Sequence, residues 1–460
     1  MEQSDLCYLS VPLPEDLARL KAYGDLGRLS RLIDMRLAKE IPEALRSRLL
    51  LEKEIVRLLP ACYPYTQHEA QLLMDATFSG FTPAELDALR DEDAADWAYI
   101  DGELRYKDNF VDNIIKTRPE WADRVKDARY QRSRNRGALL LDETIARMEA
   151  RGGLCYRIHL RTSLRILPAF ERPGERVRVH MPLPVAYAQV KNLKLLAFSP
   201  DPAYISPEEY PQRTACFEGV FPAGQVFSAE YVFDNRMRFV QPDPIAALSA
   251  QPTFYTEEQP PHVRFTPYIR LLTQEIVGDA QNPVVKARRI YDFITTKVMY
   301  SFMRPYITME NIPEFAATRL KGDCGVQALL FITMCRCAGV PARWQAGLYA
   351  TPLSVGNHDW AQFYAAPYGW LFVDCSFGGS AYRAGNTKRW NFYFGNLDPF
   401  RVPLNSDFQH AFYPPRTHLR ADPYDSQSGE VEYAGGGLSA SQFEASRVLL
   451  SLSEVGEEGS

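Results

Sequence analysis

The sequence lacks the features of an exported or membrane-spanning protein. Its first seven residues, Met-Glu-Gln-Ser-Asp-Leu-Cys, contain neither the basic segment nor the apolar segment that opens a signal peptide. No apolar run approaches the length needed to cross a membrane. We therefore expect no membrane span and a cytoplasmic location.

Cysteine is sparse for the length of the chain. The eight cysteines are scattered over 460 residues, which does not make the dense disulfide framework of a small secreted protein. Cys335 and Cys337 are two residues apart on an expected helix and therefore face different directions. We interpret these two as packing residues and expect the thiols to be reduced.

Basic residues are outnumbered by acidic ones, 52 Lys and Arg against 57 Asp and Glu. The net charge is -5, and no cluster of basic residues alternates with aromatics, so the sequence predicts no nucleic-acid partner. Apolar residues make up 46% and charged residues 24%, which is typical of a globular protein. A chain of 460 residues is too long for one hydrophobic core, so we expect several domains.

The periodicity of the sequence predicts that the chain has four parts. Residues 1–150 read as mostly helical, and residues 151–250 alternate as the antiparallel strands of a β-sandwich do. Residues 262–420 contain helices followed by antiparallel strands, an α+β layout. Residues 421–460 form an acidic, Gly- and Ser-rich tail, in which we expect one docked helix around Val448–Leu452.

One stretch of the third part has the chemistry of a nucleophile. Gly322-Asp323-Cys324-Gly325 precedes a run whose apolar residues follow the one-face spacing of an amphipathic helix. Asp323 is a good N-cap, so Cys324 falls in the first helical turn. Unpaired N–H groups and the helix dipole favour the thiolate there.

A cysteine nucleophile needs a base and a group that orients the base. His358 lies near the start of one expected strand, and Asp374 ends the next, after a tight turn at Pro367-Tyr-Gly369. Two antiparallel strands joined in this way bring such positions side by side, although the counting of residues does not force it. Asp374 would then accept from one ring nitrogen of His358, and the other nitrogen would face Cys324.

These motifs, in this order, resemble the transglutaminase-like superfamily. The resemblance rests on Gly322-Asp-Cys324-Gly, Ala338-Gly-Val-Pro-Ala-Arg343, His358-Asp-Trp360 and Gly369-Trp-Leu-Phe-Val-Asp374, and it covers roughly residues 265–405. It implies a papain-like core in which Cys324 is the nucleophile, His358 the acid and base, and Asp374 the orienting group. The preceding β region looks like the sandwich that accompanies such cores in bacterial members.

The resemblance also indicates where this chain departs from its relatives. One arm of the oxyanion hole should be the N–H of Cys324. Vertebrate-type members supply a second donor from an upstream tryptophan, but no Trp lies between Trp121 and Trp344, so we name Tyr300 as the candidate. Their acidic calcium-binding loops are not apparent either, and we expect neither a metal nor a cofactor.

Two classes of function remain open from the sequence. The first is a thiol-dependent hydrolase or acyltransferase that attacks an amide bond of a peptide or glutamine side chain and forms an acyl-enzyme. The second is a catalytically silent binding or scaffold protein with the same fold. Cleavage at a glycosylated asparagine ranks low, because the Cys pairs of the zinc site in peptide N-glycanases are missing. The sequence leaves open the oligomeric state, the substrate, and whether water or an amine accepts the acyl group.

Overall fold

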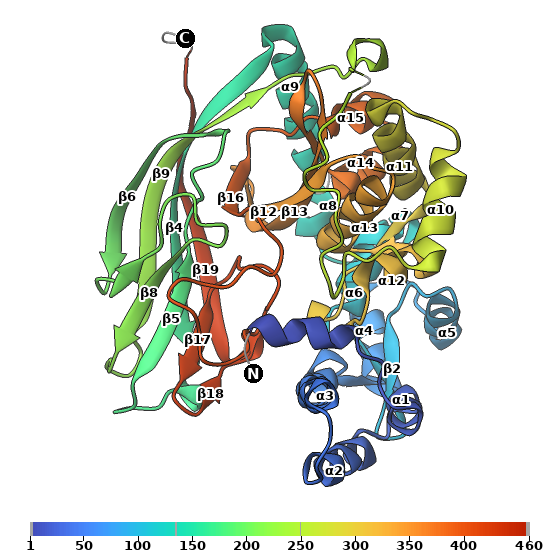
Figure 1. Cartoon of the computed structure of the whole chain (residues 1–460), viewed down its shortest axis with the longest axis vertical. Helices are drawn as coiled ribbons and strands as arrows, with labels where there is room; N and C mark the ends of the chain where they lie inside the picture. The colour runs from blue at the N-terminus through green and yellow to red at the C-terminus, as the bar shows by residue number, and fades with distance from the viewer. Residues whose placement is uncertain (1–2, 134–135, 249, 457–460) are drawn as a thin grey trace.

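The computed structural model of the chain describes residues 3–133, 136–248 and 250–456. A helical N-terminal region, two β-sheets and a mixed α/β core make up its α+β architecture, which confirms the predicted fold class (Figure 1). Within the described residues, no helix combines the length and the apolarity that crossing a membrane would require.

The N-terminal region is mostly helical, as predicted, and also contains a small sheet. The sheet has the order β1-β3-β2, in which β2 and β3 form the hairpin at Asp101-Gly102. Its elements are η1 (Gln3–Ser10), α1 (Glu15–Ala22), α2 (Leu26–Leu37), α3 (Glu43–Cys62), β1 (Tyr65–Thr66), α4 (Gln67–Thr77), α5 (Pro83–Asp91), β2 (Trp97–Ile100), β3 (Glu103–Tyr106), α6 (Phe110–Thr117), α7 (Pro119–Ala122), α8 (Ala128–Ser133) and α9 (Arg136–Arg151). Helices α1 to α3 bury their apolar faces in the same cluster as the core helices, whereas α4 to α7 enclose a separate cluster.

Helix α9 lies apart from the rest of this region, beside α15 (Thr387–Phe392) of the core (Figure 1). Two ion pairs join these helices, Arg389 to Asp142 at 3.0 Å and Lys388 to Glu149 at 2.6 Å. The helical region therefore does not behave as one unit, because its last helix packs on the core.

Two antiparallel sheets form the second part and share one hydrophobic cluster. One sheet has the strand order β19-β4-β9-β6, and the other has the order β18-β17-β5-β8-β7. Their strands are β4 (Gly153–Ile166), β5 (Val177–Pro182), β6 (Val190–Ser199), β7 (Tyr204–Ile205), β8 (Thr214–Gly219), β9 (Val226–Arg238), β17 (Glu430–Tyr433), β18 (Gly436–Gly437) and β19 (Phe443–Glu454), with the short helices η2 (Pro168–Phe170), η3 (Pro244–Ala246) and η5 (Ala440–Gln442).

The C-terminal stretch differs from the prediction. The run Val448–Leu452, expected as a docked helix, is part of strand β19, which pairs with β4 along its length. Strand β17 likewise pairs with β5. The physical reason is tertiary: β4 offers an open edge, and main-chain hydrogen bonding to that edge favours a strand over the helix that a short apolar run suggests.

The core consists of a five-stranded antiparallel sheet, ordered β15-β14-β13-β12-β16, with helices packed on it. Its helices are α10 (Pro267–Val277), α11 (Pro283–Lys297), η4 (Tyr306–Thr308), α12 (Ile312–Arg319), α13 (Cys324–Cys337), α14 (Cys375–Arg383) and α15. Its strands are β10 (Met299–Tyr300), β11 (Lys321–Gly322), β12 (Ala342–Ala350), β13 (Val355–Ala365), β14 (Gly369–Val373), β15 (Phe394–Gly395) and β16 (Arg401–Asn405). Strand β14, expected to end at Asp374, ends at Val373, because Asp374 caps the start of α14.

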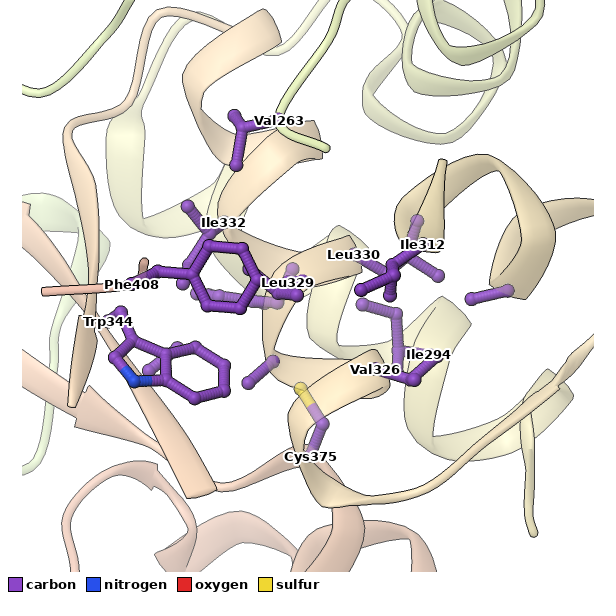
Figure 2. Packing of buried hydrophobic residues seen from close by; sticks show 14 of the residues in the cluster. Val263, Ile294, Ile312, Val326, Leu329, Leu330, Ile332, Trp344, Cys375 and Phe408 are labelled. Carbon is purple, nitrogen blue, oxygen red and sulfur yellow. The ribbon is translucent and has the colours of Figure 1, made fainter. Parts of the chain in front are cut away.

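Helix α13 lies at the centre of the core rather than at its surface. The one-face pattern predicted an amphipathic helix, but every residue from Gly325 to Arg336 is buried. Figure 2 shows Val326, Leu329, Leu330 and Ile332 of this helix among side chains from other elements. Two buried polar residues of α13 donate to nearby carbonyls, Gln327 to Gly322 at 2.9 Å and Thr333 to Leu329 at 2.7 Å, which helps the helix tolerate burial on all sides.

Candidate active site

Cys324 is the first residue of α13, where the sequence placed it. The Asp323 carboxylate caps the helix by accepting the N–H of Val326 at 3.1 Å. Strand β11 pairs in parallel with β10 just before the cap, with Tyr300 opposite Gly322. A Cβ at position 322 would lie 2.3 Å from the Val326 side chain, so only glycine allows this close turn into the helix. The half-buried cysteine thus lies at the end of the helix where N–H groups are free.

His358 and Asp374 lie on adjacent strands and touch. Residues Ala361 and Val373 face each other across β13 and β14. This register brings the Nε2 atom of His358 to 2.7 Å from Oδ2 of Asp374, and both side chains are buried. The Nδ1 atom of His358 has no hydrogen-bond partner in the part of the chain that the structure describes. That nitrogen is therefore available to take up or release a proton.

Both oxygens of the Asp374 carboxylate are fully engaged. Oδ1 accepts from the hydroxyl of Ser376 at 3.0 Å and from the N–H of Phe377 at 2.9 Å, and Oδ2 accepts from Arg401 at 2.8 Å as well as from His358. Burial by itself would raise the pKa of Asp374, but the charges of His358 and Arg401 hold it below its usual range. Asp374 is therefore fixed as a carboxylate that orients the imidazole.

The Cys324 sulfur contacts Asp359, the residue after His358. Its Sγ lies 3.4 Å from Oδ2 of Asp359, a distance at which the thiol donates a hydrogen bond to the carboxylate. Burial, together with the nearby carboxylates of Asp359 and Asp323, raises the pKa of Cys324 well above that of a free thiol. The helix start favours a thiolate, but in this structure the two carboxylates oppose that effect, and the sulfur is held as a neutral thiol.

Replacing Asp359 with asparagine is expected to make Cys324 more reactive. The substitution removes a negative charge next to the sulfur, which lowers the thiol pKa and raises the labelling rate by iodoacetamide at pH 7 about three- to tenfold. Peptide mapping would assign the labelled cysteine. Asp201→Asn is the matched control, since it removes an exposed carboxylate on the sandwich. Slower labelling in Asp359→Asn would mean instead that Asp359 serves as the base for the thiol.

Asp359 is itself held by the segment that precedes β17. The carboxyl of Asp359 forms a hydrogen bond with the carboxyl of Asp425. The side chain of Gln427 donates to the main-chain carbonyl of the preceding residue, His358, at 3.3 Å. Burial and the proximity of the two acids raise the pKa of both Asp359 and Asp425. The hydrogen bond between these two carboxyls holds Asp359 in place beside the sulfur.

Tyr300, expected from the sequence to be the second oxyanion donor, lies opposite Gly322, two residues before Cys324. It and His358 line one cavity of about 300 Å³. Burial raises the pKa of the Tyr300 hydroxyl well above its usual value, so the group stays protonated. Within the described residues this hydroxyl makes no hydrogen bond, which leaves it free to donate to a substrate oxygen.

Three residues of the site were missed from the sequence. Asp359 follows His358 directly, but no role was predicted for it. Arg401 lies at the end of the segment 391–401, to which the sequence assigned no role. Lys116 comes from α6, far along the chain, and lines the same cavity as His358. Only Asp359 left a local signal, an acidic residue inside the strand next to the histidine.

The described residues contain no cluster of potential metal ligands. Residues 3–133, 136–248 and 250–456 contain no group of three or more His, Cys, Asp or Glu side chains placed to hold a metal ion. All eight cysteines are free thiols.

Comparison with known proteins identifies the core. Residues 270–375 match the family model of the transglutaminase-like superfamily, a segment that runs from α10 to the start of α14 and contains Cys324, His358 and Asp374. The resemblance inferred from the sequence is confirmed for this segment, which is similar to the transglutaminase-like superfamily. A search of curated proteins finds no match.

Three solved structures are similar to this chain at low identity. A candidate cysteine protease from Cytophaga hutchinsonii has 14% identity and a TM-score of 0.39, with 66% of this chain and 90% of the other covered. The periplasmic domain of TgpA from Pseudomonas aeruginosa has 15% identity and a TM-score of 0.28, with 53% and 94% covered. A candidate protease from Parabacteroides distasonis has 13% identity and a TM-score of 0.23, with 45% and 42% covered.

Proposed function

We propose that this chain is a thiol-dependent hydrolase or acyltransferase that attacks an amide bond through Cys324, His358 and Asp374. The observation that carries the proposal is the buried contact of 2.7 Å between His358 and Asp374, directly beside the residue that holds the Cys324 sulfur. A carboxylate that fixes one imidazole nitrogen leaves the other free to exchange a proton with a thiol.

The reaction begins when the thiol leaves Asp359 and turns toward Nδ1 of His358. His358 takes the thiol proton as the sulfur attacks the amide carbonyl carbon, and the N–H of Cys324 donates to the oxygen that becomes negative. The bond between carbon and nitrogen then breaks, and the imidazolium gives its proton to the leaving amine. The product is an acyl-enzyme, a thioester at Cys324, which water or an amine resolves with His358 again as base.

The acyl-enzyme gives a direct test. With p-nitrophenyl acetate as a generic acyl donor, we expect a burst of nitrophenolate and an acetyl group mapped to Cys324 by mass spectrometry. His358→Ala should slow the burst by about 10⁴-fold, since the proton acceptor for the thiol is lost. The control is His159→Ala, which removes a strand histidine that binds Glu230 on the sandwich at 2.9 Å.

A second function, a silent binding protein, is favoured by one observation. The contact that the Cys324 sulfur makes is with Asp359 at 3.4 Å, and burial and the adjacent carboxylates raise the thiol pKa. Absence of a burst in the wild-type chain, with Cys324→Ser no different from it, would support this function and overturn the first. If the burst occurs, a glutamine peptide incubated with a primary amine separates a hydrolase, which yields the free acid, from an acyltransferase, which yields the amine adduct.

A further inference from the structure

The cavity beside His358 has an unbalanced charge. Among the residues that line it are two cations, Lys116 and Arg383, and the hydroxyl-bearing Ser354 and Ser380, whereas no aspartate or glutamate lines it. Several buried cations elsewhere in the fold are paired with carboxylates, as Arg416 is with Glu430 and Arg401 with Asp374 and Asp398. A hollow that gathers two cations with no lining carboxylate is suited to an anionic group.

Lys116 reaches the cavity from the N-terminal region. Its ammonium lies 3.8 Å from the ring centroid of Tyr300 and 4.8 Å from that of Phe302. Asn113, one turn earlier on α6, accepts the N–H of Phe302 at 2.9 Å and thereby fixes the helix against the core. In the described part of the chain, Lys116 forms no ion pair with a carboxylate within 4.0 Å. The aromatic rings position the ammonium without neutralising it.

Arg383 approaches from the opposite end of α14. This helix begins at Cys375, directly after the carboxylate that orients His358, and Arg383 is its last residue. Its guanidinium is exposed at the cavity and, over the described ranges, has no acidic partner within 4.0 Å. The two cations therefore come from different parts of the chain and share one hollow, whose wall includes His358.

We infer that Lys116 and Arg383 bind a carboxylate of the acyl substrate, so that the amide attacked by Cys324 belongs to a peptide residue with a free carboxylate nearby. This inference rests on the proposed function and adds the class of substrate to it. It also gives the N-terminal helical region a role, since α6 supplies one of the two specificity-determining residues.

Lys116 has a second electrostatic effect that the test must separate from binding. Its charge lowers the pKa of the Cys324 thiol, against the larger effects of burial and of Asp359. Loss of Lys116 would therefore change the amount of thiolate for every reagent alike. A ratio of two reagents that alkylate the same thiolate, and differ in charge alone, cancels this effect.

The experiment compares iodoacetate, which carries a carboxylate, with the neutral iodoacetamide. Rates at Cys324 are measured at pH 8.5 and low salt, with each rate divided by that for N-acetylcysteine. We expect the wild-type ratio of iodoacetate to iodoacetamide to exceed that of the free thiol by about fivefold, and to fall to the free-thiol ratio in Lys116→Gln with Arg383→Gln. Lys116→Arg should keep the ratio high, because it keeps the charge.

The control is Lys194→Gln, which removes an exposed, unpaired lysine on the described part of the sandwich, and should leave the ratio unchanged. Labelling of Cys324 with the ratio of a free thiol would overturn the inference and leave the proposed function standing. No labelling of Cys324 by either reagent, while other cysteines react, would mean that the cavity gives no access to the sulfur, and both would fail.

Discussion

Replacing Arg401 with methionine is expected to lower the free energy of unfolding by about 3–5 kcal/mol. Arg401 is fully buried, and its guanidinium donates to Asp374 at 2.8 Å and to Asp398 at 2.6 Å. Methionine has similar length but no charge, so two buried carboxylates would lose their shared cation. Burying an unpaired carboxylate costs more than the packing of the methionine regains.

The measurement is chemical denaturation at pH 7, with Arg19→Met as the matched control. Arg19 forms an exposed pair with Glu15 on α1, and its loss should change stability by less than about 0.5 kcal/mol. The pH dependence gives a second check. The pKa of Asp374 lies below its usual value of 3.8 in the folded state, so its contribution is present above pH 3.8 and is lost as the pH falls toward the folded pKa. The deficit of Arg401→Met should therefore shrink in acid, and a deficit independent of pH would mean that packing, not charge, is lost.

Arg401 also explains why the site lies where residues from three strand regions of the core sheet meet. Residue 374 directly follows β14, residue 358 lies on β13, and residue 401 begins β16 at the edge of the sheet. The cation lets the carboxylate stay charged although it is buried, and the charged carboxylate in turn orients the imidazole. The stability of the fold and the proposed catalysis would therefore depend on the same buried network.

The sequence predicted the local part of this site well. The N-cap at Asp323 and the glycine before it fix the start of α13, and the tight turn before Gly369 fixes the pairing of β13 with β14. These are short-range features, in which a residue type and a spacing of a few positions determine the backbone. Cys324, His358 and Asp374 were found in this way.

The remaining part depends on contacts between distant segments, which leave no local pattern. Lys116 is exposed on a short helix and looks like any surface lysine until α6 docks through Asn113. Strand β19 is a strand because β4 offers it an edge, not because of its composition. The contact made by Asp359 could not be predicted from the sequence. Strand alternation predicts only that its side chain points away from His358, and the structure shows that the Cys324 sulfur lies beside it.

Replacing Asp374 with asparagine is expected to slow acylation of Cys324 by p-nitrophenyl acetate on the order of 10³- to 10⁴-fold. The amide oxygen can still accept the N–H of Phe377, so α14 keeps its cap, but the negative charge next to Nε2 of His358 is gone. An asparagine that donates its NH₂ to Nε2 leaves the ring proton on Nδ1. That nitrogen is then unable to accept the proton of the thiol, and the imidazolium loses its stabilising partner.

The control for this variant is Asp25→Asn, the same substitution at another helix cap. Asp25 caps α2 by accepting the N–H of Arg28 at 3.1 Å, as Asp374 caps α14. It should leave the burst rate unchanged, which separates loss of the orienting charge from loss of a cap. A burst in Asp374→Asn within tenfold of wild type would show that His358 does not depend on this carboxylate. The short contact between them would then be a feature of stability alone, and Asp359, which already holds the sulfur, would become the group to test as the base.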